Sequence, residues 1–442
     1  MSDASVWRNR GFVAFLAGQF ATNAGDSLYT VALLWLTLQL TGSSAVVGAV
    51  NAILLLPWLL QALAGPFVDR LPLRPLLVGS QLTQGAVVLV LPLAHGTGQL
   101  TVGVIIAVAT VLMLASLVMA PMDSALLPRL VADSQLSRAN SALATVTLGL
   151  DMVFDAVGGA FIAIFGATTL FLVDAGTFAV AAVLFATVTV APLPAESTDT
   201  DETNGFETDD ADIDESSEIE STGLREYLAD LRVGVDALRG TVFVELTALT
   251  ALANFATGVT LAILPAFGAG LDGATLYRIS LDGAVIYGAM LGALGIGRLV
   301  GSVLGPRFET VPYGRFCIAR GMLSGLAWVA SVFAPGPALT IVLFGLAWVP
   351  VGISGVLSST LRQRLFPTDK LGRVSAVKGT ASGATLPIGS LIGGVVGSTL
   401  GIRPTLALAA LGFGLAAPYV ALRGPLRQLP SVSTAEPSDF GL

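Results

Sequence analysis

The stretch that decides the fold is APLPAESTDTDETNGFETDDADIDESSEIESTG, residues 191–223. It holds twelve carboxylates and no Lys or Arg, in a chain of 442 residues that is 54% hydrophobic and only 12% charged. A segment so acidic and so poor in apolar side chains cannot bury enough surface to offset the entropy of ordering it. We therefore expect residues 191–223 to form a solvated, disordered linker between two parts of the chain.

The two parts that flank this linker resemble each other weakly. Arg129-Leu130-Val131 is matched by Arg364-Leu365-Phe366, and Gly158-Gly159 is matched by Gly393-Gly394, both at an offset of 235 residues. This internal repeat predicts two related halves joined by a polar tether.

The apolar composition indicates a membrane protein, since the mean hydropathy is +0.81. A membrane-spanning helix needs about 20 mostly apolar residues. Twelve segments qualify: 12–40, 46–68, 75–93, 100–122, 140–165, 168–190, 243–267, 281–304, 314–334, 338–360, 374–400 and 404–422. The sequence therefore predicts an all-α, polytopic membrane protein with twelve transmembrane helices in two pseudo-symmetric six-helix bundles.

These spans and the linker divide the chain into five expected parts. They are a first half (1–190), the linker, an amphipathic surface helix (224–240), a second half (241–424) and a cytoplasmic tail (425–442). The surface helix is expected because apolar residues recur at helical spacing beside arginines: Leu224, Leu228, Leu231 and Val235.

The distribution of basic residues predicts the orientation in the membrane. With both termini inside, seventeen Lys and Arg lie on the cytoplasmic side, whereas only Arg278 and Arg403 lie outside. We expect a multi-pass protein of a prokaryotic plasma membrane, with the termini and the linker in the cytoplasm. Only two of the 22 basic residues are Lys, which favours a halophilic source, although an ordinary acidic linker is the alternative. We expect a monomer in the lipid bilayer that has no nucleic-acid partner.

Two stripes of glycine recur at four-residue spacing. They are Gly297, Gly301 and Gly305 in the eighth span, and Gly389, Gly393 and Gly397 in the eleventh. Small residues on one helix face let two backbones approach closely in lipid. The stripes predict tight static packing or, alternatively, packing that also permits sliding between conformations.

The loop after the second span resembles the signature of a known family. It reads Gly65-Pro66-Phe67-Val68-Asp69-Arg70-Leu71-Pro72-Leu73-Arg74. This is similar to the Gly-x-x-x-Asp-Arg-x-Gly-Arg-Arg motif of the major facilitator superfamily, with Gly65, Asp69, Arg70 and Arg74 in place. It departs from the motif at Pro72 and Leu73.

Further residues resemble the exporter branch that includes macrolide-efflux and enterobactin-export proteins. These residues are Gly18-Gln19, Asn23, Gly25, Asp26, Leu127-Pro128, Arg138-Ala139-Asn140 and Leu172-Val173-Asp174-Ala175. The chain departs from this branch at Phe154-Asp155, where the branch often has Gly-Pro.

The resemblance implies that the loop after the second span latches the cytoplasmic face. Asp69 would accept hydrogen bonds from the N-terminus of a neighbouring helix, where partial positive charge favours an anion. Arg70 and Arg74 would bind carboxylates or carbonyl groups. A static topology anchor is the alternative.

Four carboxylates fall within the spans of the first half: Asp26, Asp151, Asp155 and Asp174. Ionisable groups at membrane depth are costly and are therefore functional candidates. No Lys or Arg of these spans is placed to neutralise them, and a buried, unpaired carboxyl takes up a proton more readily. We hypothesise that Asp151, with Asp26 or Asp155, binds a proton or a cationic substrate in alternation. Alternatively, these carboxylates line a water-filled cavity and stay ionised.

Other polar residues at membrane depth are open to two interpretations. Asn23 is expected to face the cavity or to bridge helices by hydrogen bonds. In the second half, Glu245, Arg298 and Arg320 predict a gate or a structural ion pair rather than a substrate contact.

Together these features predict a secondary active transporter. We expect a proton-coupled exporter of small amphipathic or cationic compounds, working by rocker-switch alternating access between the halves. The alternatives are an uptake carrier of the same fold and a non-transporting membrane sensor. An enzyme is disfavoured because the chain has one His and lacks Gly-x-Ser-x-Gly, His-Glu-x-x-His and nucleotide-loop motifs. We expect no cofactor and no metal, only an ion gradient, of protons, as the driving force.

Overall fold

The computed structural model describes most of the predicted membrane domain. The described residues are 6–57, 59–60, 72–117, 119–132, 135–149, 151–188, 232–271, 273, 275–276 and 279–442. The predicted linker 191–223 lies outside them. Of the predicted surface helix 224–240, residues 232–240 are described, and 232–238 are helical.

In the described residues, the first half is a bundle of helices that follow the expected spans. They are α1 (Arg10–Thr41), α2 (Ser44–Leu55), α4 (Leu73–Val88), α5 (Val90–Gly96), α6 (Val102–Ser116), α7 (Met119–Leu130), α8 (Leu136–Gly149), α9 (Asp151–Phe165) and α10 (Ala167–Ala186). Polar side chains cap the helix starts: the Asn9 side chain accepts from the Phe12 amide, and Ser43 caps α2. Gly42, at φ 61°, adopts the left-handed conformation that ends α1.

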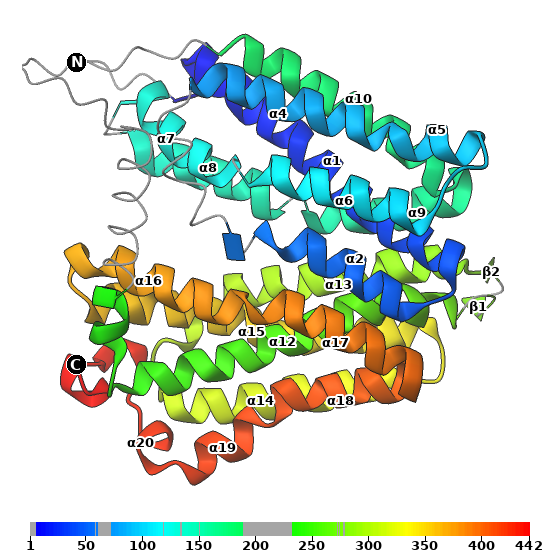
Figure 1. Cartoon of the computed structure of the whole chain (residues 1–442). Coiled ribbons are helices and arrows are strands. Elements are labelled where there is room, and N and C mark those ends of the chain that lie inside the picture. The colour runs from blue at the N-terminus through cyan, green and yellow to red at the C-terminus, as the bar shows by residue number, and fades with distance from the viewer. Residues whose placement is uncertain are drawn as a thin grey trace, which may run out of the picture.

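The second half repeats this plan in the described residues. Its helices are α12 (Val242–Ala269), α13 (Gly283–Leu304), η3 (Gly305–Phe308), α14 (Tyr313–Val332), α15 (Pro337–Leu365), α16 (Thr368–Gly383), α17 (Thr385–Leu400), α18 (Ile402–Gly414), α19 (Ala416–Leu422) and α20 (Gly424–Arg427). Figure 1 shows the two halves as two layers of near-parallel helices, with the first half above the second.

The twelve predicted spans are confirmed as two six-helix bundles. Seven described helices or joined helix pairs are long and apolar enough by themselves to cross a membrane: Leu73–Gly96, Ala167–Ala186, Val242–Ala269, Gly283–Phe308, Pro337–Leu365, Lys370–Leu400 and Ile402–Leu422. The other expected spans coincide with α1, α6–α7, α8–α9 and α14, and α2 covers the start of the second span, whose later part lies outside the described residues. One detail differs from an all-helical chain, because β1 (Thr275–Leu276) and β2 (Ile279–Ser280) form a short antiparallel hairpin before α13.

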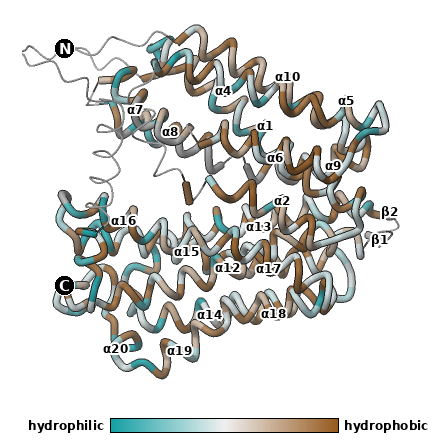
Figure 2. Tube along the Cα trace, viewed as in Figure 1, coloured by the Kyte–Doolittle hydropathy of each residue, from teal (hydrophilic) through white to brown (hydrophobic). Residues whose placement is uncertain are grey.

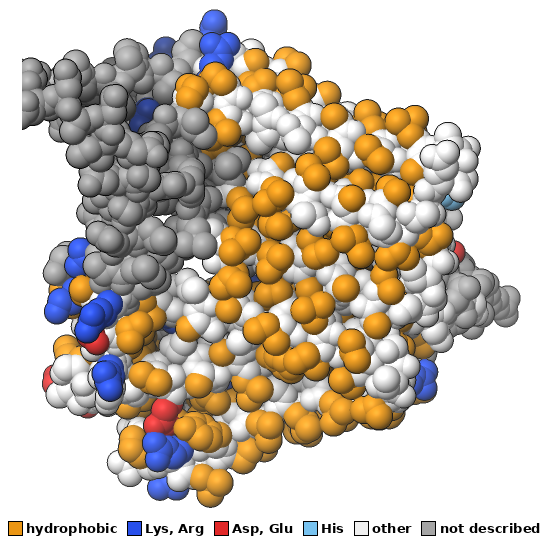
Figure 3. Space-filling view, viewed as in Figure 1, with side chains coloured by type: hydrophobic (Ala, Val, Ile, Leu, Met, Phe, Trp, Pro, Cys, Tyr) orange, Lys and Arg blue, Asp and Glu red, His pale blue; other side chains and the backbone are white. Residues whose placement is uncertain are grey.

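Large apolar side chains cover the outside of the bundle. Ile164 is 72% exposed, Val303 64% and Leu326 66%. Figure 2 shows apolar residues along the lengths of the helices, and Figure 3 shows hydrophobic side chains across the broad face in view. Such a surface matches the hydrocarbon of a bilayer, which is as apolar as these side chains.

The two ends of the bundle are named by the residues that lie there. The end that carries Arg10 and the C-terminal residues is called the termini end, and the opposite end, with Thr41 and Gly283, is called the far end. In Figure 1 the termini end lies at the left and the far end at the right.

The predicted tail 425–442 packs against the second half at the termini end. The Tyr313 amide donates to the Pro430 carbonyl at 2.9 Å, and the Ser433 amide donates to the Glu309 carbonyl at 3.1 Å. Phe440 is fully buried, and its ring centroid lies 5.4 Å from that of Phe243. The tail is therefore part of the folded second half.

Candidate functional site

The two halves meet through glycines near the far end. Gly159 of α9 lies so close to α13 that an added Cβ would be 2.5 Å from the Ala284 carbonyl oxygen and 2.6 Å from the Gly288 Cα. Gly394 of α17 packs as closely against α2, where an added Cβ would be 2.6 Å from the Ser44 carbonyl oxygen. Only glycine permits these backbone contacts.

Hydrogen bonds reinforce the contact between α2 and α17. The Asn51 Nδ2 donates to the Ser390 Oγ at 2.9 Å, and the Ser390 Oγ donates to the Gly48 carbonyl at 3.0 Å. The Ser44 Oγ donates to the Gly394 carbonyl at 3.1 Å. These bonds between buried groups join the halves in addition to the packing.

The internal repeat predicted from the sequence has a structural meaning. Gly158 packs against Leu28 of α1, within the first half, and Gly393 packs against Val259 of α12, within the second. The next residue in each pair, Gly159 or Gly394, contacts the other half. Each Gly-Gly pair therefore holds its helix to its own half with one residue and to the opposite half with the other.

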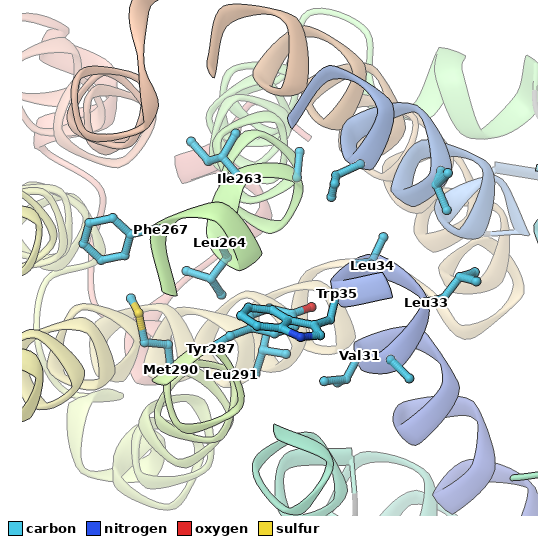
Figure 4. Close-up of a cluster of buried hydrophobic side chains, with 14 of the residues drawn as sticks. Val31, Leu33, Leu34, Trp35, Ile263, Leu264, Phe267, Tyr287, Met290 and Leu291 are labelled. Carbon is cyan, nitrogen blue, oxygen red and sulfur yellow. The ribbon is translucent and has the colours of Figure 1, made fainter. Parts of the chain in front are cut away.

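An apolar plug closes the space between the halves near the far end. The rings of Trp35 and Tyr287 stack with centroids 6.1 Å apart and planes at 13°, although the residues lie in different halves. Figure 4 shows this pair surrounded by apolar side chains of α1, α12 and α13. The labelled neighbours include Val31, Leu34, Ile263, Leu264, Met290 and Leu291.

At the termini end, the buried clusters of the described residues stay within one half each. One cluster, which includes Phe12, Phe15 and Phe185, contains first-half residues only. The other, which includes Phe243 and Phe316, contains second-half residues only. Among the described residues, the halves are thus packed together towards the far end and have separate cores at the termini end.

A polar stripe runs along α1 towards the termini end from this plug. Thr22 donates to the Gln81 Oε1 at 2.9 Å, Gln19 donates to a carboxylate oxygen of Asp123, and the Asn23 Nδ2 donates to the Gln19 carbonyl at 2.8 Å. These α1 residues share one face with Asp26 because they are spaced by three and four. Asn23 therefore bonds within its own helix through its amide nitrogen.

Asp174 is the most completely buried of the predicted acidic candidates whose side chains are described. It is 0% exposed, and its Oδ1 lies over Gly25, where an added Cβ would be 2.4 Å away. The Thr177 hydroxyl lies 3.4 Å from the Asp174 Oδ1, whereas the Asp174 Oδ2 has no hydrogen-bond partner in the described part of the chain. Burying such a carboxyl group is costly unless its charge is compensated.

Asp26, Asp174 and Tyr29 lie near one another. Asp26 is close enough to Asp174, and both carboxyl groups are close enough to Tyr29, for their charges to interact electrostatically. Asp26 is half-buried and precedes Trp35 by nine residues, or about 14 Å along a helix. Two predicted acidic candidates, from α1 and α10, thus come together on the termini side of the apolar plug.

The remaining predicted candidates of the first half lie partly outside the described part of the structure. Asp151 and Asp155 lie at the start of α9, a helix that packs against α1 and α13, but their side chains are outside the described part of the structure. Of the loop motif, Gly65, Asp69 and Arg70 lie outside the described residues. Arg74 donates to the Ala186 carbonyl at the end of α10.

The glycine stripes of the second half pack mainly within that half. Gly297 and Gly301 lie against α15, where added Cβ atoms would be 2.1 Å from the carbonyl oxygens of Gly345 and Val349. Gly305 faces the Val356 side chain. Gly389 and Gly393 lie against α12, whereas Gly397 contacts both α12 and Ser44 of the first half.

The ion pair predicted for Glu245 has a different partner from those considered in the sequence. Glu245 binds Arg423, and the Tyr419 hydroxyl donates to its Oε2 at 3.1 Å. Arg320 instead donates to the Ser354 Oγ at 3.2 Å. The Glu245 pair lies at the surface and joins the start of α12 to the end of α19.

Sequence reasoning missed Asp123, Trp35 and Tyr287 as site residues. Asp123 lies one residue beyond the predicted fourth span, but helix α7 continues to Leu130 and carries its carboxylate to Gln19. A longer span would have included it. Trp35 and Tyr287 are 252 positions apart, and nothing in the local sequence of either residue indicates the other.

Comparisons with known proteins agree with this architecture. The family model described as Major Facilitator Superfamily matches residues 15–384. No curated protein matches the chain.

Solved structures show the same fold at 12% sequence identity. A mutant of the nucleoside transporter NupG aligns with a TM-score of 0.66, covering 93% of this chain and 99% of that one. An inward-facing, occupied structure of a bacterial homologue of the human lysosomal transporter Spinster gives 0.66, with 97% of each chain covered. A POT family transporter in complex with 5-aminolevulinic acid gives 0.66, covering 94% and 96%.

The family model matches most of the chain, and the fold has two six-helix halves. These two findings assign the chain to one family. The chain belongs to the Major Facilitator Superfamily, with the fold of a secondary transporter of small molecules.

Proposed function

We propose that this transporter is a proton-coupled exporter of small amphipathic or cationic compounds in the plasma membrane. In this proposal the termini end faces the cytoplasm, and substrate enters between the halves from that side. Rocking of the halves then opens the far end and closes the termini end.

The observation that carries the proposal is the buried carboxyl group of Asp174 beside Asp26. Among the described residues, no Lys or Arg contacts Asp174, and the charge of the neighbouring Asp26 is negative. A proton on this group removes the cost of burying the charge. A cationic group of a substrate bound near Asp26 and Asp174 would favour their charged forms, whereas a proton neutralises Asp174, so binding of proton and substrate would compete.

The arrangement of contacts supports alternating access. The far end is closed by glycine-mediated contacts between α9 and α13 and between α2 and α17. Asp26 and Asp174, here called the acidic pair, lie on the termini side of the apolar plug, so that ligands bound there would be separated from the far side. Breaking the inter-half contacts would expose the same residues to the far side.

Transport into inside-out membrane vesicles tests the proposal. Ethidium, a lipophilic cation, is added outside vesicles that have an acidic lumen. Its accumulation in the lumen is followed by fluorescence, first with the pH gradient intact and then after the gradient is dissipated. We expect gradient-dependent accumulation in vesicles that contain the protein. Accumulation that does not depend on the pH gradient would contradict proton coupling. Loss of ethidium from the lumen, driven by the gradient, would contradict export.

Substitution of the acidic pair assigns the coupling site. Asp174→Asn and Asp26→Asn keep the shape of each side chain but remove its titratable group, so we expect accumulation to lose its dependence on the pH gradient. Asp236→Asn is the control because Asp236 is exposed on the helical segment 232–238. An unchanged gradient dependence in both acidic-pair variants would exclude these residues as the coupling site.

A further inference from the structure

The second half contains a cluster of three cations that the proposed function does not use. Lys378 of α16 donates from its Nζ to the Ser358 Oγ at 2.7 Å, and Arg362 of α15 donates from its Nη1 to the same oxygen at 3.1 Å. Arg320 of α14 donates to the Ser354 Oγ, one helical turn along α15. Three helices thus direct positive groups at one polar face of α15.

No carboxylate of the described residues balances this cluster. The charges that act on Lys378 are those of Arg362 and Arg320, and both are positive. The ion pair of Glu245 with Arg423 is elsewhere, at the surface between α12 and α19. Like charges held together at membrane depth are costly, and neutral hydroxyl groups offset little of that cost.

The cluster is reachable from the termini end. Ser358 precedes the end of α15 at Leu365 by seven residues, or about 10 Å along the helix. Lys378, Arg362 and Ser358 are half-buried rather than sealed in the core. Beside them, Gly355 and Gly379 are exposed, and an added Cβ at either position would meet no atom within 4 Å.

The direction of access also suits a ligand between the halves. In Figure 1, α16 lies on the side of the second half that is nearest the first half. A molecule entering from the termini end between the halves would pass this helix. Arginine and lysine together are well suited to phosphate or carboxylate oxygens, because they supply several donors and full positive charge.

We propose that Arg320, Arg362 and Lys378 form a binding site for the anionic group, a phosphate or a carboxylate, of an amphipathic ligand. The group would bridge the three cations and accept hydrogen bonds now made to Ser354 and Ser358. This inference rests on the proposed function only in its transport part, in which the transported amphipathic compounds include ones with an acidic group. The same chemistry would also hold the headgroup of an anionic lipid.

Binding measurements on the full chain in lipid nanodiscs test the site and separate the two sources. Phenyl phosphate is titrated into nanodiscs of phosphatidylcholine, with phenol as the uncharged comparison, and its affinity is measured by calorimetry. In a second arm, the melting temperature is compared between phosphatidylcholine nanodiscs and nanodiscs that also contain phosphatidylglycerol. Neither arm uses an ion gradient, so failure of export does not affect the result.

The chain provides matched control variants on the same helices. Lys378→Gln is compared with Lys370→Gln, since both lysines belong to α16 and Lys370 is exposed. Arg362→Gln is compared with Arg364→Gln, since both arginines lie on α15 and Arg364 is exposed. Without ligand, we expect the melting temperature of the two cluster variants to equal or exceed that of the parent, because like-charge repulsion is relieved.

The outcomes decide between a soluble ligand, a lipid headgroup and the absence of an anion-binding site. A dissociation constant for phenyl phosphate that rises about tenfold or more in the cluster variants but not in the controls supports a soluble anionic ligand. Stabilisation by phosphatidylglycerol that only the cluster variants lose, without binding of phenyl phosphate, supports a lipid headgroup. The proposal is overturned if neither probe acts on the parent protein, or if the control variants lose the response equally.

Discussion

Replacing Gly159 with alanine tests whether the glycine contacts hold the far end closed. An added Cβ would be 2.5 Å from the Ala284 carbonyl oxygen, about 0.9 Å less than the 3.4 Å at which ordinary van der Waals contact begins. The obstructing atoms belong to the backbone of α13, so no side-chain rotation relieves the overlap. Helices α9 and α13 must therefore move apart in this state, while a state with the far end open is unaffected.

The size of the effect follows from the cost of overpacking. An extra methyl group in a packed interface costs about 1–3 kcal/mol. Because each 1.4 kcal/mol is a factor of ten, the ratio of closed to open far ends should fall by about 5- to 150-fold. The gain in helix propensity from glycine to alanine, about 1 kcal/mol, applies to both states and cancels in the ratio.

Accessibility of a buried plug residue measures this shift. In a Cys317→Ala background, Leu291→Cys places a reporter in the apolar plug, where Leu291 is 8% exposed. A membrane-impermeant maleimide added on the far side should label the reporter faster when Gly159→Ala is present, in proportion to the open population.

The neighbouring glycine provides the control. An alanine Cβ at Gly158 would meet Leu28 and Val31 of the same half at 3.4–3.6 Å, which is ordinary contact. We expect Gly158→Ala to leave the labelling rate near that of the parent. Equal labelling rates in Gly159→Ala and the parent, or the same increase in both glycine variants, would refute the reasoning.

Three further substitutions test other parts of the structure. Trp35→Ala removes the stacking partner of Tyr287, so it should also raise labelling of the reporter; a coupling of about 0.5–1.5 kcal/mol with Tyr287→Ala in a double-mutant cycle would confirm the contact. Phe440→Ala empties a fully buried site and should destabilise the second half by about 3–5 kcal/mol in thermal unfolding, whereas Ser438→Ala, at an exposed position, should not. Glu245→Gln breaks a surface pair with side chains 52% and 25% exposed, so a loss of more than about 1 kcal/mol would contradict its assignment as a surface pair.

Much of the fold is predictable from composition and repetition. A bilayer requires long apolar helices, so hydropathy alone locates the spans in the described residues, although α7 continues to Leu130, beyond the predicted end of the fourth span at 122. The Gly-Gly repeat at 158–159 and 393–394 predicts related halves because equivalent backbones need small residues at equivalent crossings.

The site is less predictable because it is assembled from distant residues. Hydropathy identifies Asp26 and Asp174 as costly groups, but only packing of α1 on α10 shows that they lie together. Asp123 was missed because the fourth span was ended too early. The partner of Glu245 was missed because Arg423 follows the last span and is 178 residues from Glu245 in the sequence. Only the packing of the folded bundle brings the two side chains together.

At the glycine crossings, the nature of the inter-half contacts explains how the interface can be both tight and separable. The nearest neighbours of Gly159 are the Ala284 carbonyl and the Gly288 backbone, and those of Gly394 are backbone atoms of α2. Gly158, in contrast, faces the branched side chains of Leu28 and Val31. Backbones that meet without interlocking side chains can part without changing rotamers, whereas interdigitated side chains resist sliding. In the proposed cycle the contacts of Gly159 and Gly394 therefore break while that of Gly158 persists, so that each half moves as a rigid body.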